Sequence, residues 1–192
     1  EPGEHWIANS LGVMAAVRAA GGDLASAGLA LAEMGGLKGR GARHRIAVAG
    51  GEALLIDESY NANPASMRAT LKALAATPAT RRIAVLGSMK ELGDFADAFH
   101  RQLAEPLIEA GVTFTVLVGE EMRALAEELG KAAANPLGKA PGFAHCETPA
   151  DAIAALGRFG LAQGDAVLVK GSNSIGLGRL VSHLTENARV ET

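Results

Sequence analysis

Polar residues that could bind a ligand gather in three short segments, each directly after an apolar run. The segments are D-E-S-Y-N-A-N-P at 57–64, G-S-M-K-E-L-G at 87–93 and K-G-S-N-S at 170–174. Carboxylate, amide, hydroxyl and ammonium groups together can bind a polar or zwitterionic molecule through hydrogen bonds and charge. In open α/β sheets, ligands bind at the carboxyl ends of the strands. The three segments therefore predict one binding site along a single edge of a sheet.

A second interpretation of these segments stays open, because Asn, Ser and Gly are also ordinary turn residues. The third segment shows the two interpretations most clearly. Gly and Ser before a helix offer free backbone N–H groups that attract phosphate or carboxylate, and Lys170 adds a positive charge. Alternatively, Ser172 or Ser174 caps the following helix while Lys170 lies in solvent.

Several other kinds of site find little support. The segment most like a phosphate-binding loop, N-P-L-G-K-A-P at 135–141, lacks Ser or Thr after its Lys, and no G-x-G-x-x-G follows a predicted strand. The five histidines form no i, i+4 pair, which argues against a zinc site. His100 is the histidine of most interest, because its predicted helix begins near the predicted site. Cys146, the single cysteine, excludes an internal disulfide and a Cys-based metal site.

Composition describes a globular chain of one domain, or one domain and part of another. Of the 192 residues, 48% are hydrophobic and the formal net charge is -3. Aromatic residues make up only 4%, which argues against a base-stacking nucleic-acid surface. No apolar run approaches the roughly 18 residues of a membrane span. The start of the chain lacks a signal peptide and an initiator Met, so we expect a cytoplasmic fragment of a longer protein.

Short apolar strands alternate with helical segments along most of the chain. This pattern predicts an α/β fold with a mostly parallel sheet and helices on both faces. Gly50 and Gly51 lie between two apolar runs, 46–48 and 53–56, and predict a β-hairpin. Further strands are predicted at 83–86, 114–118, 143–146 and 166–169, and helices at 65–75, 95–110, 120–133, 150–159 and 178–187.

The first part of the chain has a different pattern. Segments 6–20 and 24–34 predict two helices with no charged face, which we expect to be the end of a neighbouring domain. The basic, Gly-punctuated segment 37–45 is predicted to be a linker. We therefore expect three regions: 1–36 from the neighbouring domain, the linker 37–45, and an α/β domain over 46–192.

Five motifs in this order resemble the Mur ligase family, and the resemblance covers essentially the whole chain. They are G-E-H-W-I-A-N at 3–9, G-R-G-A-R-H at 39–44, D-E-S-Y-N-A-N-P-A-S-M at 57–67, L-G-S-M-K-E-L-G at 86–93 and V-K-G-S-N at 169–173. Within the family, the motifs are most similar to those of the ligases that join D-Ala-D-Ala to UDP-N-acetylmuramoyl-tripeptide. The resemblance implies the end of a central ATPase domain followed by a whole C-terminal Rossmann-like domain.

The resemblance also implies a reaction and a set of site residues. ATP phosphorylates the tripeptide carboxylate, and the amine of D-Ala-D-Ala then attacks the acyl phosphate, with Mg²⁺ ligands mostly outside this chain. We expect no catalytic residue here, and we expect a monomer with no nucleic-acid partner. By resemblance, the ATP contacts are Asn9 at the adenine, Arg43 at the phosphate or ribose, and Asp57 or Glu58 at the ribose hydroxyls. The residues implied to border the dipeptide or to face the ATPase domain are Tyr60, Asn61, Asn63, Ser88, Glu91, Lys170 and Ser172.

The chain departs from the family pattern at three positions. Trp6 stands where the family has Asn, Glu58 where it has Asp, and Ser88 where it also has Asp. These departures concern individual polar contacts in the site. Three other functions stay open: a different amide ligase such as folylpolyglutamate synthase, a stand-alone module that binds a small anion or amino acid, and polar loops that serve only as solubilising turns.

Overall fold

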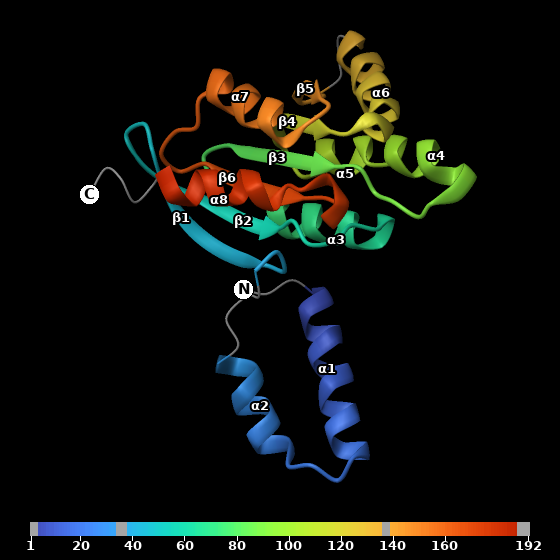
Figure 1. Cartoon of the computed structure of the whole chain (residues 1–192), viewed down its shortest axis with the longest axis vertical. Helices are drawn as coiled ribbons and strands as arrows, with labels where there is room; N and C mark the ends of the chain where they lie inside the picture. The colour runs from blue at the N-terminus through green and yellow to red at the C-terminus, as the bar shows by residue number, and fades with distance from the viewer. Residues whose placement is uncertain (1–3, 34–37, 136–138, 188–192) are drawn as a thin grey trace.

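The computed structural model describes residues 4–33, 38–135 and 139–187, and it contains a pair of helices and an α/β domain (Figure 1). Helix α1 is Glu4–Ala19 and helix α2 is Leu24–Glu33. Asp23 caps α2 by accepting a 2.7 Å hydrogen bond from the amide of Ser26. No residue of 7–33 is buried, and Leu11 and Leu29 are 65% and 68% exposed. The apolar surface of these helices therefore has no cover among the described residues.

The α/β domain is built on a six-stranded sheet of order β1-β2-β6-β3-β4-β5. Strands β1 and β2 form the predicted antiparallel hairpin, and every other neighbouring pair is parallel. The sequence prediction of a mostly parallel α/β sheet is confirmed. The strands are β1 Ala42–Val48, β2 Gly51–Glu58, β3 Arg82–Gly87, β4 Val112–Val118, β5 Gly142–Cys146 and β6 Ala166–Lys170.

Helices cover both faces of the sheet (Figure 1). One face packs against α3 Pro64–Ala75, α4 Ala96–Arg101, α5 Ala104–Glu109 and α6 Arg123–Ala134, through a core that includes Met67, Leu71, Leu103, Leu107 and Leu125. The other face packs against α7 Pro149–Phe159 and α8 Gly178–Asn187, through a core that includes Leu55, Val85, Val116, Leu156 and Leu180. Single 3-10 turns form η1 Gly93–Phe95, η2 Glu120–Met122 and η3 Asn173–Ile175.

Two predicted elements differ from the structure. Strand β1 already begins at Ala42, so the last four residues of the predicted linker are strand, paired with β2 from Ala42 opposite Asp57 onward. These four residues were not predicted as strand because they are mostly polar. Polar residues are common on an edge strand such as β1, whose side chains are partly exposed. The helix predicted over 95–110 is broken between α4 and α5, because Pro106 has no N–H to bond the carbonyl of Gln102. The proposed domain boundary itself remains a prediction.

Candidate functional site

The three polar segments identified in the sequence follow three strands that are neighbours in the sheet. Strands β2, β6 and β3 lie side by side, and Lys170 is in register with Glu58 on one side and with Leu86 on the other. All three strands are parallel, so their carboxyl ends lie at the same edge. The structure therefore confirms that these segments form one polar edge, which we call the loop edge: residues 57–63, 87–92 and 170–174.

Two of these loops touch backbone to backbone. A Cβ atom added at Gly171 would lie 2.9 Å from the Cα of Gly87, and one added at Gly87 would lie 3.2 Å from the Cα of Gly171. Glycine is thus required at both positions by the close approach. The amide of Ser172 also donates a 3.1 Å hydrogen bond to the carbonyl of Ser88. These contacts fix the second and third loops relative to each other.

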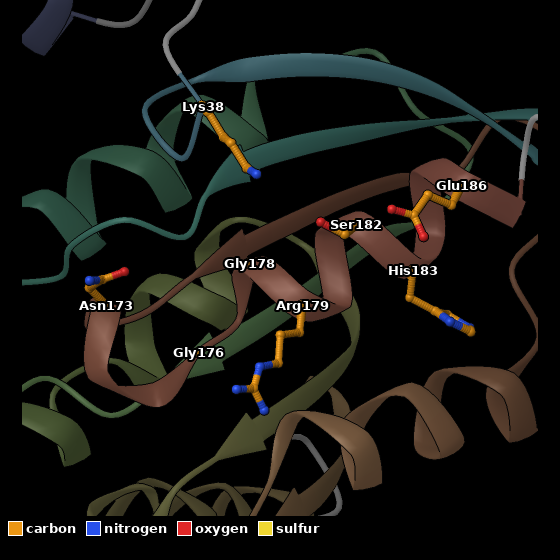
Figure 2. A pocket seen from close by; sticks show the side chains of 8 residues that line it. All are labelled: Lys38, Asn173, Gly176, Gly178, Arg179, Ser182, His183 and Glu186. Atoms are coloured by element: carbon orange, nitrogen blue, oxygen red, sulfur yellow. The ribbon is translucent and has the colours of Figure 1, made fainter.

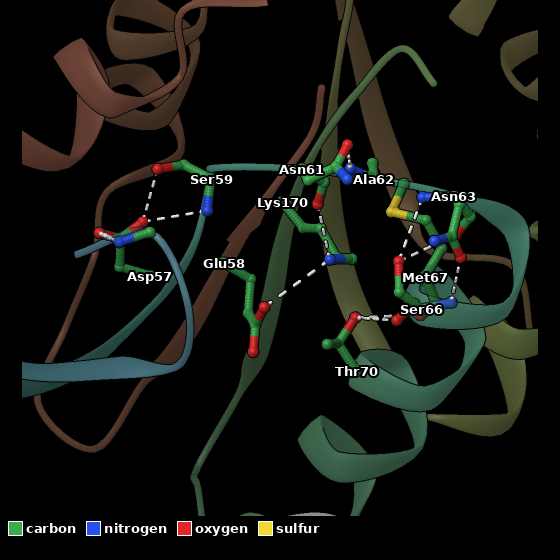
Figure 3. A network of polar contacts seen from close by, with 11 residues as sticks. Asp57, Glu58, Ser59, Asn61, Ala62, Asn63, Ser66, Met67, Thr70 and Lys170 are labelled. Carbon is green, nitrogen blue, oxygen red and sulfur yellow. Dashed lines mark hydrogen bonds and ion pairs between the residues drawn. The ribbon is translucent and has the colours of Figure 1, made fainter. Parts of the chain in front are cut away.

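Asp57 is a buried hub that holds the start of the first loop (Figure 3). It is only 1% exposed, and its Oδ1 accepts hydrogen bonds from the amide and the hydroxyl of Ser59 at 3.0 and 2.6 Å. Its Oδ2 accepts a 2.8 Å bond from the amide of Gly39. Both oxygens of Asp57 therefore serve the fold, which weighs against the predicted contact of this carboxylate with a ribose.

Asp57 and Glu58 point to opposite faces of the sheet, because successive strand residues alternate. Leu55, on the Asp57 side, belongs to the core under α7 and α8, whereas Ile56, on the Glu58 side, belongs to the core under α3. The two carboxylates thus lie in different surroundings. Of these two carboxylates, Glu58 is the one for which the contact with the ribose hydroxyls stays a prediction.

Lys170 is buried at the loop edge and ties two loops together (Figure 3). Its side chain is 3% exposed, and its Nζ donates a 2.9 Å hydrogen bond to the carbonyl of Asn61. The same Nζ lies 3.7 Å from Oε2 of Glu58, whose side chain is 13% exposed. Burial lowers the pKa of Lys170, while the nearby Glu58 carboxylate opposes this shift. The Lys170 ammonium therefore holds the first loop in place. Direct contact between Lys170 and a ligand stays a prediction.

Asn63 and Ser66 form the N-terminal cap of α3. The Asn63 side-chain oxygen accepts a 2.8 Å bond from the amide of Ser66, and the Ser66 hydroxyl contacts the amide of Asn63 at 3.1 Å. Pro64 occupies the first turn, where its missing N–H costs nothing. The side chain of Asn63, predicted to bind the dipeptide, thus has a structural role. Asn61, whose Oδ1 accepts the amide of Ala62 at 2.9 Å, is exposed at the same loop.

Tyr60 packs against the segment that leads into β1. Its amide donates a 3.1 Å bond to the carbonyl of Gly39, and its ring lies under the guanidinium of Arg40 at 4.4 Å. Gly39 has φ +75°, and an added Cβ would lie 2.8 Å from the Cβ of Tyr60. Tyr60 is still 48% exposed, so its ring remains accessible at the loop edge.

The second loop combines a buried start with an exposed, strained tip. Ser88 is fully buried, and both its amide, at 2.9 Å, and its hydroxyl, at 3.4 Å, donate to the carbonyl of Val118, so direct ligand contact stays a prediction for Ser88. Glu91 is exposed and has φ +62°, the one non-glycine residue with positive φ in the part of the chain that the structure describes. A left-handed conformation costs about 1–2 kcal/mol for such a residue. The surrounding contacts therefore hold Glu91 in a conformation it would not adopt alone.

Lys90 and Glu121 form an ion pair that ties the second loop to η2. Burial raises the pKa of Glu121, but hydrogen bonds from Lys90, a backbone amide and Ser88 outweigh it and bring the pKa down to about 2. An acid with a depressed pKa in the folded state stabilises the fold above its unfolded value near 4.5, and this contribution is lost as pH falls towards about 2.

We expect Glu121→Gln to lower the free energy of unfolding by about 1 kcal/mol at pH 7, since the pair is partly exposed. The difference from wild type should shrink as the pH approaches the pKa of Glu121. Urea unfolding at pH 7 and pH 3 measures both values. Glu120→Gln, at the exposed neighbour of Glu121, is the matched control, and an equal loss in both variants would contradict the assignment.

The remaining predicted residues lie apart from one another. Asn9 is exposed on α1, which stands away from the sheet in Figure 1. Arg43 is exposed on β1 opposite Ile56, on the Glu58 face of the hairpin. Ser172 is partly buried, and its hydroxyl contacts that of Ser174 at 3.2 Å. Trp6 belongs to α1, but its side chain lies outside the described part of the structure.

A shallow groove next to the loop edge was not predicted from the sequence (Figure 2). It has a volume of about 490 Å³ and lies along α8, with Asn173 from the third loop at one end. Lys38 extends over it from the segment before β1 (Figure 2). The lining mixes cations, one carboxylate and small polar groups: Lys38, Asn173, Gly176, Gly178, Arg179, Ser182, His183 and Glu186. A basic residue before β1 and another on the last helix are too distant in sequence to suggest such a surface.

Two features are absent from residues 4–33, 38–135 and 139–187. No helix there combines the length and hydrophobicity of a membrane span. These residues also contain no group of three or more His, Cys, Asp or Glu side chains placed to hold a metal ion.

Comparisons with known proteins agree on one family. Residues 44–173 match the model of the Mur ligase, glutamate ligase domain. The chain is 36% identical over 149 residues to the UDP-N-acetylmuramoyl-tripeptide–D-alanyl-D-alanine ligase of Synechocystis sp., covering 77% of the chain and 30% of the relative. It is 36% identical over 197 residues to the Mycobacterium tuberculosis ligase of the same name, covering 95% of the chain and 38% of the relative.

The structural comparison gives the same result. The crystal structure of MurF from Acinetobacter baumannii superposes with a TM-score of 0.78 at 29% identity, over 96% of this chain and 38% of that protein. The chain thus spans only about a third of the length of its relatives, 30% to 38% in these three cases. The match over 44–173, together with the predicted motifs at the loop edge, shows that the chain belongs to the Mur ligase family.

Proposed function

We propose that this chain is the C-terminal part of an ATP-dependent ligase that joins D-Ala-D-Ala to UDP-N-acetylmuramoyl-tripeptide in peptidoglycan precursor synthesis, in the cytoplasm. The observation that carries the proposal is the loop edge, where three segments with the family motifs are tied together by the Lys170–Asn61 and Ser172–Ser88 hydrogen bonds. The named ligases from Synechocystis and Mycobacterium tuberculosis support this choice of substrates. Ligation itself requires parts of the protein beyond this chain.

The loop edge would orient the dipeptide amine for attack on the acyl phosphate. Holding two reactants in the correct geometry is itself a large contribution to such a reaction. At neutral pH the amino group of D-Ala-D-Ala is largely an ammonium, which a carboxylate can hold by a charge-assisted hydrogen bond. The ammonium would have to release a proton to solvent or to a base before its nitrogen attacks the acyl phosphate. The exposed carboxylate of Glu91 is available for this contact, and its strained backbone agrees with a binding role.

The ATP contacts of this chain would come from the hairpin and the helix pair. We propose Glu58 for the ribose hydroxyls, Arg43 for the nucleotide and Asn9 for the adenine. The rest of the protein would hold the nucleotide next to Asn9. It would also cover the exposed apolar residues of α1 and α2. Mg²⁺ would neutralise charge on the transferred phosphoryl group, with its ligands mostly outside this chain.

Calorimetric titration of D-Ala-D-Ala into the full-length ligase tests the proposal. The cell contains a non-hydrolysable ATP analogue and UDP-N-acetylmuramoyl-tripeptide. Wild type should bind the dipeptide saturably, and Glu91→Gln should weaken binding by about tenfold or more, because a hydrogen bond to a charged group is lost. Glu109→Gln, the same change at the end of α5 before β4, should bind like wild type.

The outcomes separate the parts of the proposal. Equal binding by wild type and Glu91→Gln would keep the dipeptide but remove Glu91 as its contact. If wild type does not bind the dipeptide, D-Ala-D-Ala is not the acceptor, and another acceptor used within the same family becomes the better proposal.

A further inference from the structure

The backbone of the second loop is held by a buried histidine that the proposed reaction does not use. The Nε2 atom of His100, on α4, lies 2.9 Å from the amide nitrogen of Met89. Its Nδ1 atom lies 2.7 Å from the carbonyl oxygen of Ala96, one turn earlier in the helix. His100 is fully buried and Met89 is 1% exposed, so water does not compete for either contact.

Only one protonation state of the ring satisfies both contacts. The amide of Met89 can only donate, so Nε2 must accept with its lone pair, and the carbonyl of Ala96 can only accept, so Nδ1 must carry the proton. The ring is therefore neutral with its hydrogen on Nδ1. In an imidazolium both nitrogens would be donors, and Nε2–H would face the N–H of Met89.

We propose that His100 is a positioning residue, whose neutral imidazole fixes the backbone at Met89 and thereby places the exposed carboxylate of Glu91 at the loop edge. Ser88 is already held by its amide bond to Val118 and its carbonyl bond from Ser172. The His100 bond fixes the next amide in the chain. Two residues later the backbone adopts the positive φ of Glu91, so a loop freed at Met89 would lose the geometry that orients this side chain.

The electrostatic surroundings agree with a neutral ring. Burial lowers the pKa of His100, and this effect outweighs the opposing influence of the Ala96 carbonyl. The charged groups that face the ring are Asp97 on its own helix, Glu121 from η2 and Lys90 from the loop; the two carboxylates raise the pKa and Lys90 lowers it. Protonation should therefore occur below pH 6.5 and should release the loop.

Nuclear magnetic resonance on the 192-residue chain tests the contact without any assay of ligation. At pH 7 the imidazole nitrogen shifts should report the neutral ring with its proton on Nδ1. As His100 titrates below pH 6.5, the Met89 amide should exchange with solvent roughly tenfold faster, after correction for the intrinsic pH dependence, while the core amide of Val85 stays protected. Either of two results would overturn the proposal: a ring protonated on Nε2 at pH 7, or a Met89 amide whose corrected exchange rate does not change as His100 titrates.

Two substitutions separate positioning from simple packing. In His100→Gln the longer side chain can place an acceptor near the Nε2 position, whereas in His100→Asn the side chain ends near Nδ1 and cannot reach Met89. We expect Met89 protection in His100→Gln to be retained and independent of pH, and to be lost in His100→Asn. His44→Gln, on the edge strand β1, controls for loss of a histidine. If His100→Asn fails to fold, the wild-type titration still decides the question.

A kinetic measurement links the contact to the site and rests on the proposed function. In the full-length ligase, His100→Asn should raise the KM for D-Ala-D-Ala more than it lowers kcat, and His100→Gln should restore it. An unchanged KM in a folded His100→Asn ligase would overturn the link to Glu91. If the wild-type ligase is inactive with the dipeptide, the proposed function is contradicted. The magnetic resonance experiment would still test the contact between His100 and the Met89 amide.

Discussion

Replacing Asp57 by Asn should lower the free energy of unfolding by about 2–3 kcal/mol, because the carboxylate accepts three hydrogen bonds in a buried position. An asparagine has nearly the same shape but only one accepting oxygen. Its NH₂ group would face the amide of either Gly39 or Ser59, so two donors would meet without water to separate them. Urea unfolding of the 192-residue chain at pH 7 measures the loss.

The control for this prediction is Asp94→Asn, the same change at an exposed acid in η1, which should alter stability by less than about 0.5 kcal/mol. Ser59→Ala provides an intermediate case, because it removes the hydroxyl bond and leaves both amide bonds to Asp57 in place. A loss for Asp57→Asn no larger than that for Asp94→Asn would show that Asp57 is not a structural hub. Its predicted contact with a ribose would then regain support.

Replacing Lys170 by Met should lower the free energy of unfolding by about 3 kcal/mol. This is the low end of the range for removing one partner of a buried ion pair, because the Glu58 side chain is partly exposed. The side chains have similar volume, so packing at the carboxyl end of β6 should survive. The change leaves the Asn61 carbonyl without the Lys170 donor and removes the ammonium that lies 3.7 Å from the Glu58 carboxylate. Chemical denaturation at pH 7 gives the loss in free energy.

A double-mutant cycle shows whether the charge pair is responsible. Adding Glu58→Met to Lys170→Met also removes the carboxylate that Lys170 faces, and we expect the double variant to be more stable than Lys170→Met alone. Lys131→Met is the control, because Lys131 pairs with Glu128 on an exposed helix face where such pairs are worth less than about 1 kcal/mol. Strict additivity of the two single losses would refute the coupling of Lys170 to Glu58.

The strands and their order along the chain are predictable from the sequence because a buried parallel sheet needs apolar runs of strand length. The polar segments after β2, β3 and β6 can likewise be placed at one edge, because each follows such a run directly. The neighbour relation β2-β6-β3 brings together residues more than a hundred positions apart, such as Asn61 and Lys170. Their hydrogen bond depends on that strand order, which the apolar runs do not specify.

The division of tasks inside the site is less predictable, although some signals are present. Strand alternation alone separates Asp57 from Glu58. The order Asn63, Pro64 and Ser66 is also a recognisable helix start, with a capping residue, a proline in the first turn and a polar side chain that returns the bond. For Asp57 and Asn63, local hydrogen bonds explain the polar side chain better than the predicted ligand contact does.

Two further features have no sequence signal. Glutamate is not a residue that predicts a left-handed backbone, so the φ of Glu91 could not be foreseen. The contact of His100 with Met89 depends on how the loop turns back over α4, which no periodicity describes. Both features arise from the packing of the loop.

The close approach of Gly87 and Gly171 makes the second and third loops one mechanical unit. Their backbones are so near that a displacement of either loop by an incoming ligand would be transmitted directly to the other. On the proposed function, a change in the preferred acceptor could therefore not arise by adding a side chain at this junction. It would have to come from the outer positions of each loop, such as Glu91 and Ser174, where new side chains can be accommodated without separating the two strands.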